Sequence, residues 1–163
     1  MPFSHLSPYL HRAESVTLEY EESPGQRADV VKTVCGMLNR RGGHVLIGVT
    51  DGGEPIGCRA LEKQMQQLRG ELRAIRPVRA VDPEVAEWEG GLGIVYIYVP
   101  DGSSKPYEHN GVGYYRLDAE TVELSADRER DLLRGRDEGT DRWERRAARG
   151  GRDVAHRPAA REQ

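Results

Sequence analysis

The chain has 163 residues, with 24 Lys and Arg against 27 Asp and Glu and a formal net charge of -3. Because 37% of the residues are hydrophobic and 31% are charged, this length predicts one domain with a modest core. The negative balance excludes indiscriminate attraction of phosphates over the whole surface. No apolar run approaches the roughly 20 residues of a membrane span. Cys35 and Cys58 have no CxxC spacing, so we expect a cytoplasmic protein without a zinc site or a disulfide framework.

The first predicted element is the stretch "ESVTLEYEE", residues 14–22. Apolar and polar residues alternate along it, which is typical of a half-buried strand. Val16, Leu18 and Tyr20 would share the buried face. Thr17, Glu19 and Glu21 would share the other face, which is either solvated or the floor of a site.

A helix, a strand and a second helix follow. Val30, Val34 and Leu38 recur at helical spacing and predict a helix over 28–39, closed by the glycines at 42 and 43. The apolar run 44–49 predicts a central strand. A second helical stripe lies within residues 60–77 and ends at the proline; its members are Leu61, Met65, Leu68, Leu72 and Ile75.

The last part of the predicted domain contains a hairpin, a loop and a helix. Segments 84–89 and 92–100 read as the hairpin, and 114–117 reads as a short strand. Ser125 is the expected N-cap of a helix ending at Gly135. The order predicts an α+β fold with a single mixed, mostly antiparallel sheet and helices packed on it. We expect an N-terminal extension over 1–13, a domain over 14–135 and a charged, disordered tail over 136–163.

Three segments in this order resemble one family. They are "ESVTLEYEE", "VVKTVCGMLNRRGGHVLIGVTDGGEPIGC" and "KPYEHNGVGYYRL". Together they are similar to the Schlafen-type AlbA-like domain, also described as a divergent AAA domain. The most specific part is an asparagine and a double glycine that lead into an apolar strand and a "DGG" turn.

The resemblance implies a function and a set of residues. Members of the family bind nucleic acids, and some are metal-dependent endoribonucleases that cut transfer or ribosomal RNA. Their two glutamates and one aspartate are matched here by Glu14, Glu19 and Asp51, which the resemblance assigns to catalysis and to Mg²⁺ or Mn²⁺ binding. One departure is Glu21, where the family often has a lysine. The glycine-rich segment 42–53 lacks the GK[ST] ending of a phosphate-binding loop, so no ATP is expected.

Elementary electrostatics is compatible with two interpretations of the acidic residues. Two carboxylates about 5 Å apart repel by about 3 kcal/mol at an effective dielectric constant of 20, so the cluster must be exposed, protonated or neutralised by a cation. Oxygen-only ligands suit Mg²⁺ or Mn²⁺. An exposed strand edge with solvated glutamates is the alternative.

Cationic and aromatic residues mark the expected nucleic-acid surface. Arginines at one-turn spacing can follow phosphates, although a solvated helix face is the simpler interpretation for the second helix. Aromatic rings beside cations can stack on unpaired bases. The predicted binding residues are Arg40, Arg41, Lys105, Tyr107, Tyr115, Arg116, Arg73 and Arg76.

The leading hypothesis from the sequence is a metal-dependent endoribonuclease that cleaves structured RNA such as transfer RNA. The alternative is a non-catalytic DNA- or RNA-binding module with a regulatory role. The family often builds a clamp from two such domains, which suggests a homodimer for a chain with a single copy.

Overall fold

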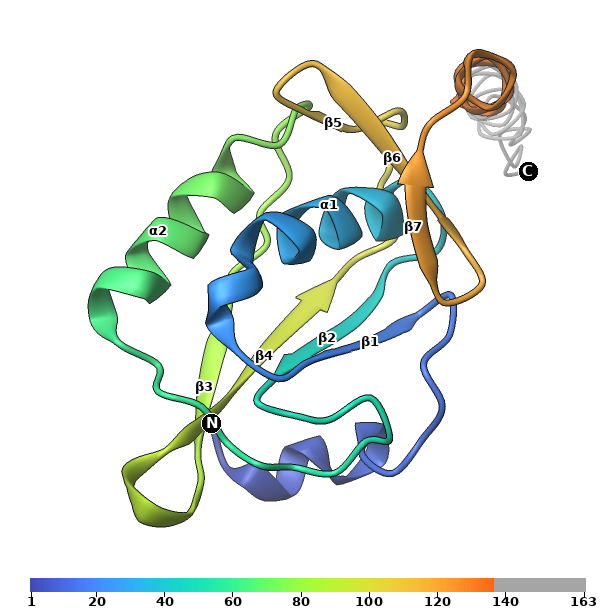
Figure 1. Ribbon diagram of the computed structural model, residues 1–163. Helices are drawn as coiled ribbons and strands as arrows, with labels where there is room; N and C mark the ends of the chain where they lie inside the picture. Colours follow the sequence, from blue (N-terminus) through green and yellow to red (C-terminus); the bar gives the residue numbers. More distant parts are fainter. Residues whose placement is uncertain (137–163) are drawn as a thin grey trace, which may run out of the picture.

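The computed structural model describes residues 1–136, so the predicted tail from 137 onward lies outside the described residues. Figure 1 shows two sheets with a helix between them. One sheet has the strand order β1-β2-β4-β3 and the other β5-β6-β7. The strands are β1 (Leu18–Glu21), β2 (Gly43–Ile47), β3 (Glu84–Glu87), β4 (Gly93–Val99), β5 (Glu108–His109), β6 (Val112–Leu117) and β7 (Glu120–Glu123). The helices are α1 (Arg27–Leu38) and α2 (Glu62–Arg73), with 3-10 turns η1 (Phe3–Tyr9), η2 (Pro24–Gln26) and η3 (Glu89–Gly91).

The fold is α+β as expected, but the prediction of a single sheet is wrong. Helix α1 separates the two sheets, because it is buried along both its β2-facing and its β6-facing sides. A Cβ atom added to Gly36 would lie 3.2 Å from the backbone of Tyr115, so helix and strand are in very close contact. A helix that is buried nearly all round must have a partner on each face.

The larger sheet is mixed. β1 runs parallel to β2, while β4 runs antiparallel to both β2 and β3, which confirms the predicted hairpin. The face toward α1 and α2 carries the main core, with Val45, Ile47, Val95 and Ile97 essentially fully buried. Glu19 and Glu21 of β1 lie on this same face, at the edge of the sheet, because residues alternate in direction along a strand.

The other face of the larger sheet is covered by the N-terminal residues. In η1 the side chain of Leu6 is completely buried, and Leu10 follows it into a cluster with Leu18, Tyr20 and Leu46. The predicted extension over 1–13 therefore packs as a layer of the fold. Within residues 1–136, no helix is both long and apolar enough to cross a membrane.

A buried asparagine fixes the end of α1. The Asn39 side chain donates to the carbonyls of Tyr107 at 2.9 Å and Tyr114 at 2.7 Å, and its Oδ1 accepts from the Tyr107 amide at 2.6 Å. Gly42, at φ +74, lies against the backbone of Pro100 and Asp101, where a Cβ would be only 2.3 Å from the Val99 carbonyl oxygen. The loop between α1 and β2 is thus held against the loop after β4.

The last helical segment lies beside β6 and β7. Residues 126–136 are helical, and Ser125 caps them through a 3.2 Å hydrogen bond from the Arg128 amide to its Oγ. The predicted cap is confirmed. The predicted end at Gly135 is wrong, since Arg136 is still helical.

Candidate functional site

The three carboxylates singled out in the sequence lie around the edge strand β1. Glu14 precedes the strand, and its Oε1 accepts a hydrogen bond from the Tyr20 amide at 3.1 Å. Glu19 lies within β1, and Asp51 is exposed in the turn after β2. Glu14 and Asp51 both contribute to raising the pKa of Glu19, so the three groups repel one another.

A buried arginine holds this region together. Arg116 of β6 is 1% exposed, and its guanidinium forms an ion pair with Glu19 Oε2. It also donates to the carbonyl of Ser15 at 2.9 Å, to that of Leu18 at 3.2 Å and to Thr121 Oγ1 at 3.2 Å. Through these contacts the Arg116 guanidinium joins the larger sheet to the smaller one. The prediction that Arg116 binds nucleic acid is wrong in this arrangement, because its guanidinium is buried and fully engaged.

The carboxylates do not fit a metal ion as they are placed here. Their chemistry suits Mg²⁺ or Mn²⁺, but Glu14 is held by a backbone amide and Glu19 by an arginine. Within residues 1–136, no three His, Cys, Asp or Glu side chains are grouped so that they could hold a metal ion. We therefore derive no metal-dependent step from this geometry.

Burial and crowding raise the pKa of two glutamates on β1. For Glu19, burial is the main cause of a raised pKa, and the Arg116 guanidinium opposes it. For Glu21, burial followed by repulsion from Glu19 and Asp29 raises the pKa to about 7. Among residues 1–136, Glu21 has no ion-pair partner and no cation lowers its pKa, so it is partly protonated near neutral pH.

This shift predicts a pH-dependent stability. An acid whose pKa is raised in the folded state stabilises the fold at low pH, and that stabilisation is lost as pH rises through the folded-state pKa. For Glu21 the window runs from 4.5 to about 7. We expect the melting temperature of the native chain, relative to that of Glu21→Gln, to decrease as the pH rises from 4.5 to about 7. Thermal unfolding of both proteins across the window checks this, and a constant difference would contradict it.

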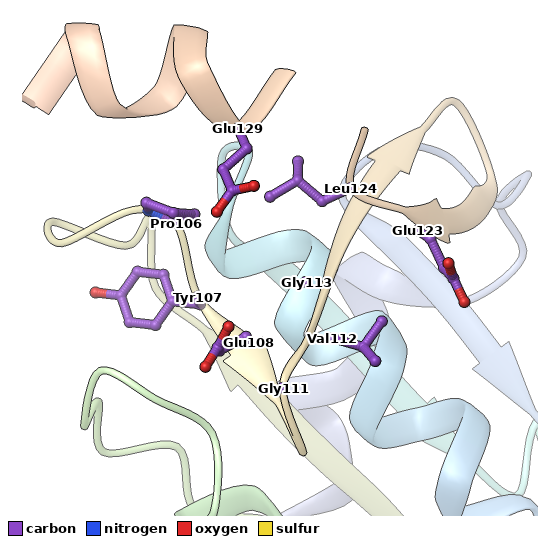
Figure 2. Close-up of a pocket in the computed structure, with 9 residues that line it drawn as sticks. All are labelled: Pro106, Tyr107, Glu108, Gly111, Val112, Gly113, Glu123, Leu124 and Glu129. Carbon is purple, nitrogen blue, oxygen red and sulfur yellow. The ribbon is translucent and has the colours of Figure 1, made fainter. Parts of the chain in front are cut away.

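Two surface hollows near these elements are acidic. One, of about 430 Å³, lies between β1, α1 and β7, and its four carboxylates outnumber its two cations, Lys32 and the paired Arg116; the carboxylates are those of Glu19, Glu21, Asp29 and Glu123. Figure 2 shows the other, of about 300 Å³, where Glu129 reaches from the last helix toward Pro106 and Leu124. Because carboxylates repel phosphates, neither hollow suits a nucleic-acid backbone.

Basic residues gather beside the C-terminal end of α1. Arg40 and Arg128 both lie over the ring of Tyr115, with their guanidinium carbons 5.2 and 4.5 Å from the ring centre. Arg41 follows Arg40 in the chain and is exposed. We call these four residues, Arg40, Arg41, Tyr115 and Arg128, the arginine patch. None of the three guanidiniums of the arginine patch forms an ion pair with a carboxylate of residues 1–136.

Hydrogen bonds to neighbouring backbone hold Arg40 of the arginine patch in position. Arg40 also donates to the Arg116 carbonyl at 3.0 Å, and Lys105 Nζ donates to the Arg40 carbonyl at 2.9 Å while pairing with Asp101. Two guanidiniums held on one ring concentrate positive charge at this place on the surface, which attracts an anion. The arrangement is therefore suited to a phosphate.

The other predicted binding residues have different positions. Tyr107 is 1% exposed, with its hydroxyl accepting from the Ser104 amide at 3.1 Å, so the prediction that it stacks on a base is wrong. Arg73 and Arg76 are exposed at the end of α2, beside β5 rather than on the arginine patch. Their role stays a prediction. Sequence reasoning missed Arg128, because its contact is with a ring on a different element and no local spacing signals it.

Comparisons with known proteins add a family and two similar structures. The family described as Schlafen, AlbA_2 matches residues 14–125. The crystal structure of the DIP2311 protein from Corynebacterium diphtheriae has 20% identity and a TM-score of 0.54, with 76% of this chain and 28% of that chain covered. The solution structure of the N-terminal domain of a putative ATP-dependent DNA helicase RecG-related protein from Nitrosomonas europaea has 21% identity and a TM-score of 0.48, with 69% and 83% covered. A search among curated proteins found no match. The likeness to the Corynebacterium protein supports the fold alone.

Proposed function

We propose that this chain, which belongs to the Schlafen, AlbA_2 family, binds single-stranded or locally unpaired nucleic acid through its arginine patch. The family supplies the expectation of nucleic-acid binding. The position of the binding surface comes from the charges on this particular chain, since its net charge of -3 leaves no general attraction for phosphates.

The observation that carries the proposal is the pair of guanidiniums on Tyr115. Arg40 and Arg128 come from segments far apart in the sequence, yet both contact one ring without a carboxylate partner among the described residues. Arg130, two residues further along the last helix, instead pairs with Asp127. Arginine binds phosphate oxygens through a planar fork of donors, and the Tyr115 ring holds that fork in position.

Phosphodiester cleavage is the second candidate function. The observation in its favour is that Glu14 and Asp51 lie close enough to Glu19 to contribute to its raised pKa. The ion pair between Glu19 and Arg116 argues against it, because the buried guanidinium already neutralises the central carboxylate. Binding without cleavage is the function that this geometry supports best.

The experiment that tests the proposal measures binding and cleavage in one sample. Labelled transfer RNA, single-stranded RNA and single-stranded DNA are incubated with the full chain and Mg²⁺ or Mn²⁺. We expect retarded but intact nucleic acid. The absence of binding at low salt would contradict the proposal.

Cleavage would establish the second candidate if it were lost in Asp51→Asn. Asp51 is exposed in a turn, so this substitution tests the chemistry without removing a buried contact. Glu54→Gln, an exposed change in the same turn, is the matched control. It should leave any cleavage unchanged.

A further inference from the structure

A ladder of aromatic rings lies on the face of the larger sheet that is turned away from α1. His44 of β2 pairs across the strands with Tyr98 of β4, and Tyr96 is on the same face two residues earlier. Tyr9, from the end of η1, lies over them. The ring centres of Tyr9 and His44 are 4.1 Å apart at an interplanar angle of 28°, and those of His44 and Tyr96 are 5.9 Å apart at 15°.

The inner rings of the ladder are fixed in position. His44 Nδ1 and the Tyr96 hydroxyl are 2.8 Å apart and share a hydrogen bond. Burial lowers the pKa of His44, so its ring is neutral near physiological pH. Cross-strand aromatic pairs stabilise sheets, which accounts for these partly buried rings.

Tyr98 is the cross-strand partner of His44 but, unlike the inner rings, it is exposed. Its side chain is 57% exposed, and its only ring contact within residues 1–136 is a tilted one with His44, at 5.7 Å and 43°. It is the terminal ring of the ladder and has an open side. Stacking on such a ring is sequence-tolerant, because every nucleobase has a π-face.

The ladder and the arginine patch are at the same end of the sheet. Arg41 is three residues before His44, and Gly42 between them is packed against Pro100 and Asp101, just after Tyr98. The backbone from Arg41 to His44 spans at most about 10 Å, so Arg41 lies close to the cross-strand pair of His44 and Tyr98. Exposed aromatic rings beside a positively charged surface are the combination by which sheet surfaces bind single strands.

We propose that Tyr98, supported by His44, Tyr96 and Tyr9, is a stacking platform for an unpaired base of the single-stranded nucleic acid held by the arginine patch. This inference rests on the proposed function. It adds a preference for unpaired over paired strands and a contribution from Tyr9, which precedes the family match at 14–125.

The test compares Tyr98→Ala and Tyr98→Phe with the native chain. The probes are a labelled single-stranded RNA of about ten nucleotides, within the site size of single-strand binders, and the same oligonucleotide with abasic positions throughout. We expect Tyr98→Ala to lose about tenfold in affinity for the base-containing RNA and Tyr98→Phe to retain it. Binding of the abasic probe should be unchanged in all three proteins, because it lacks the base. A 5-iodouracil probe should photocrosslink to the peptide that contains Tyr98.

Two outcomes would overturn the inference in different ways. If the native chain binds both probes and Tyr98→Ala binds the base-containing RNA as tightly as the native chain, the platform is wrong and the arginine patch stands. If the native chain binds neither probe at low salt, the proposed function fails together with the platform. Because Tyr98 is exposed, its variants should melt at the native temperature, and circular dichroism checks this directly.

Discussion

Replacing Arg116 by alanine should destabilise the fold by at least about 3 kcal/mol, the cost of removing one partner of a buried ion pair. The substitution leaves Glu19 without its cation and removes one of the two donors to the carbonyls of Ser15 and Leu18, each of which keeps a backbone amide donor. Urea unfolding of native chain and variant gives this difference directly.

Arg116→Lys is the matched control for charge. Lysine keeps the positive charge but has no planar fork that reaches several acceptors at once. We expect its stability to lie between those of the native chain and Arg116→Ala. If Arg116→Ala unfolded within about 1 kcal/mol of the native chain, a loss typical of an average substitution, the proposed central role of this residue in joining the two sheets would be wrong.

Replacing Arg41 and Arg128 together should weaken binding of single-stranded RNA by about a hundredfold. Hydrogen bonds to charged groups contribute about 1.5–3 kcal/mol each, and about 1.4 kcal/mol corresponds to tenfold in affinity. Arg40 is left in place because it also binds the Arg116 carbonyl, so its loss would affect the fold. Fluorescence anisotropy of a labelled RNA measures the change.

Arg130→Ala is the control for this pair of substitutions. It removes the same charge from the same helix, but its guanidinium is paired with Asp127. We expect it to reduce affinity less than twofold, an effect smaller than about 0.4 kcal/mol. Equal losses in Arg130→Ala and Arg128→Ala would indicate that general charge, rather than the arginine patch, governs binding. A loss in Arg73→Ala would extend the surface to α2.

Hydrophobic periodicity was sufficient to predict the main elements. The stripes of α1 and α2 and the apolar run of β2 are long enough for their period to be clear, and they are buried as expected except for Leu61, which precedes α2 and is 54% exposed. Ser125 was identified as a cap because its hydroxyl serves an amide three residues later, a local interaction that spacing reveals. Elements whose stabilising contacts lie close together in the sequence could therefore be predicted from local sequence patterns.

The second sheet could not be predicted from the same signals. β7, with the sequence Glu120–Glu123, has a single apolar residue, Val122, and forms only because β6 is beside it. The smaller sheet is separate from the larger one because α1 lies between them. That position of α1 depends on a tertiary contact, the packing of Gly36 against Tyr115 and Thr121. No pattern within either strand encodes that contact.

The misplacement of Arg116 had a signal that could have corrected it. Successive residues of a strand point to opposite faces, so Tyr115 and Arg116 cannot both belong to one exposed surface. Tyr114 packs against the core, and Arg116 shares its face. Alternation alone separates Tyr115 from Arg116, and the structure adds that the face of Arg116 is the buried one, where Glu19 pairs with it.

The salt dependence of RNA binding tests the central claim most directly. For single strands, the logarithm of the binding constant falls with the logarithm of the salt concentration by about 0.7 for each phosphate neutralised. Three arginines therefore predict a slope of about -2 for the native chain between about 50 and 200 mM salt, and about -0.7 for the Arg41→Ala, Arg128→Ala variant. A slope near zero for the native chain, or an unchanged slope in the variant, would contradict nucleic-acid binding through the arginine patch.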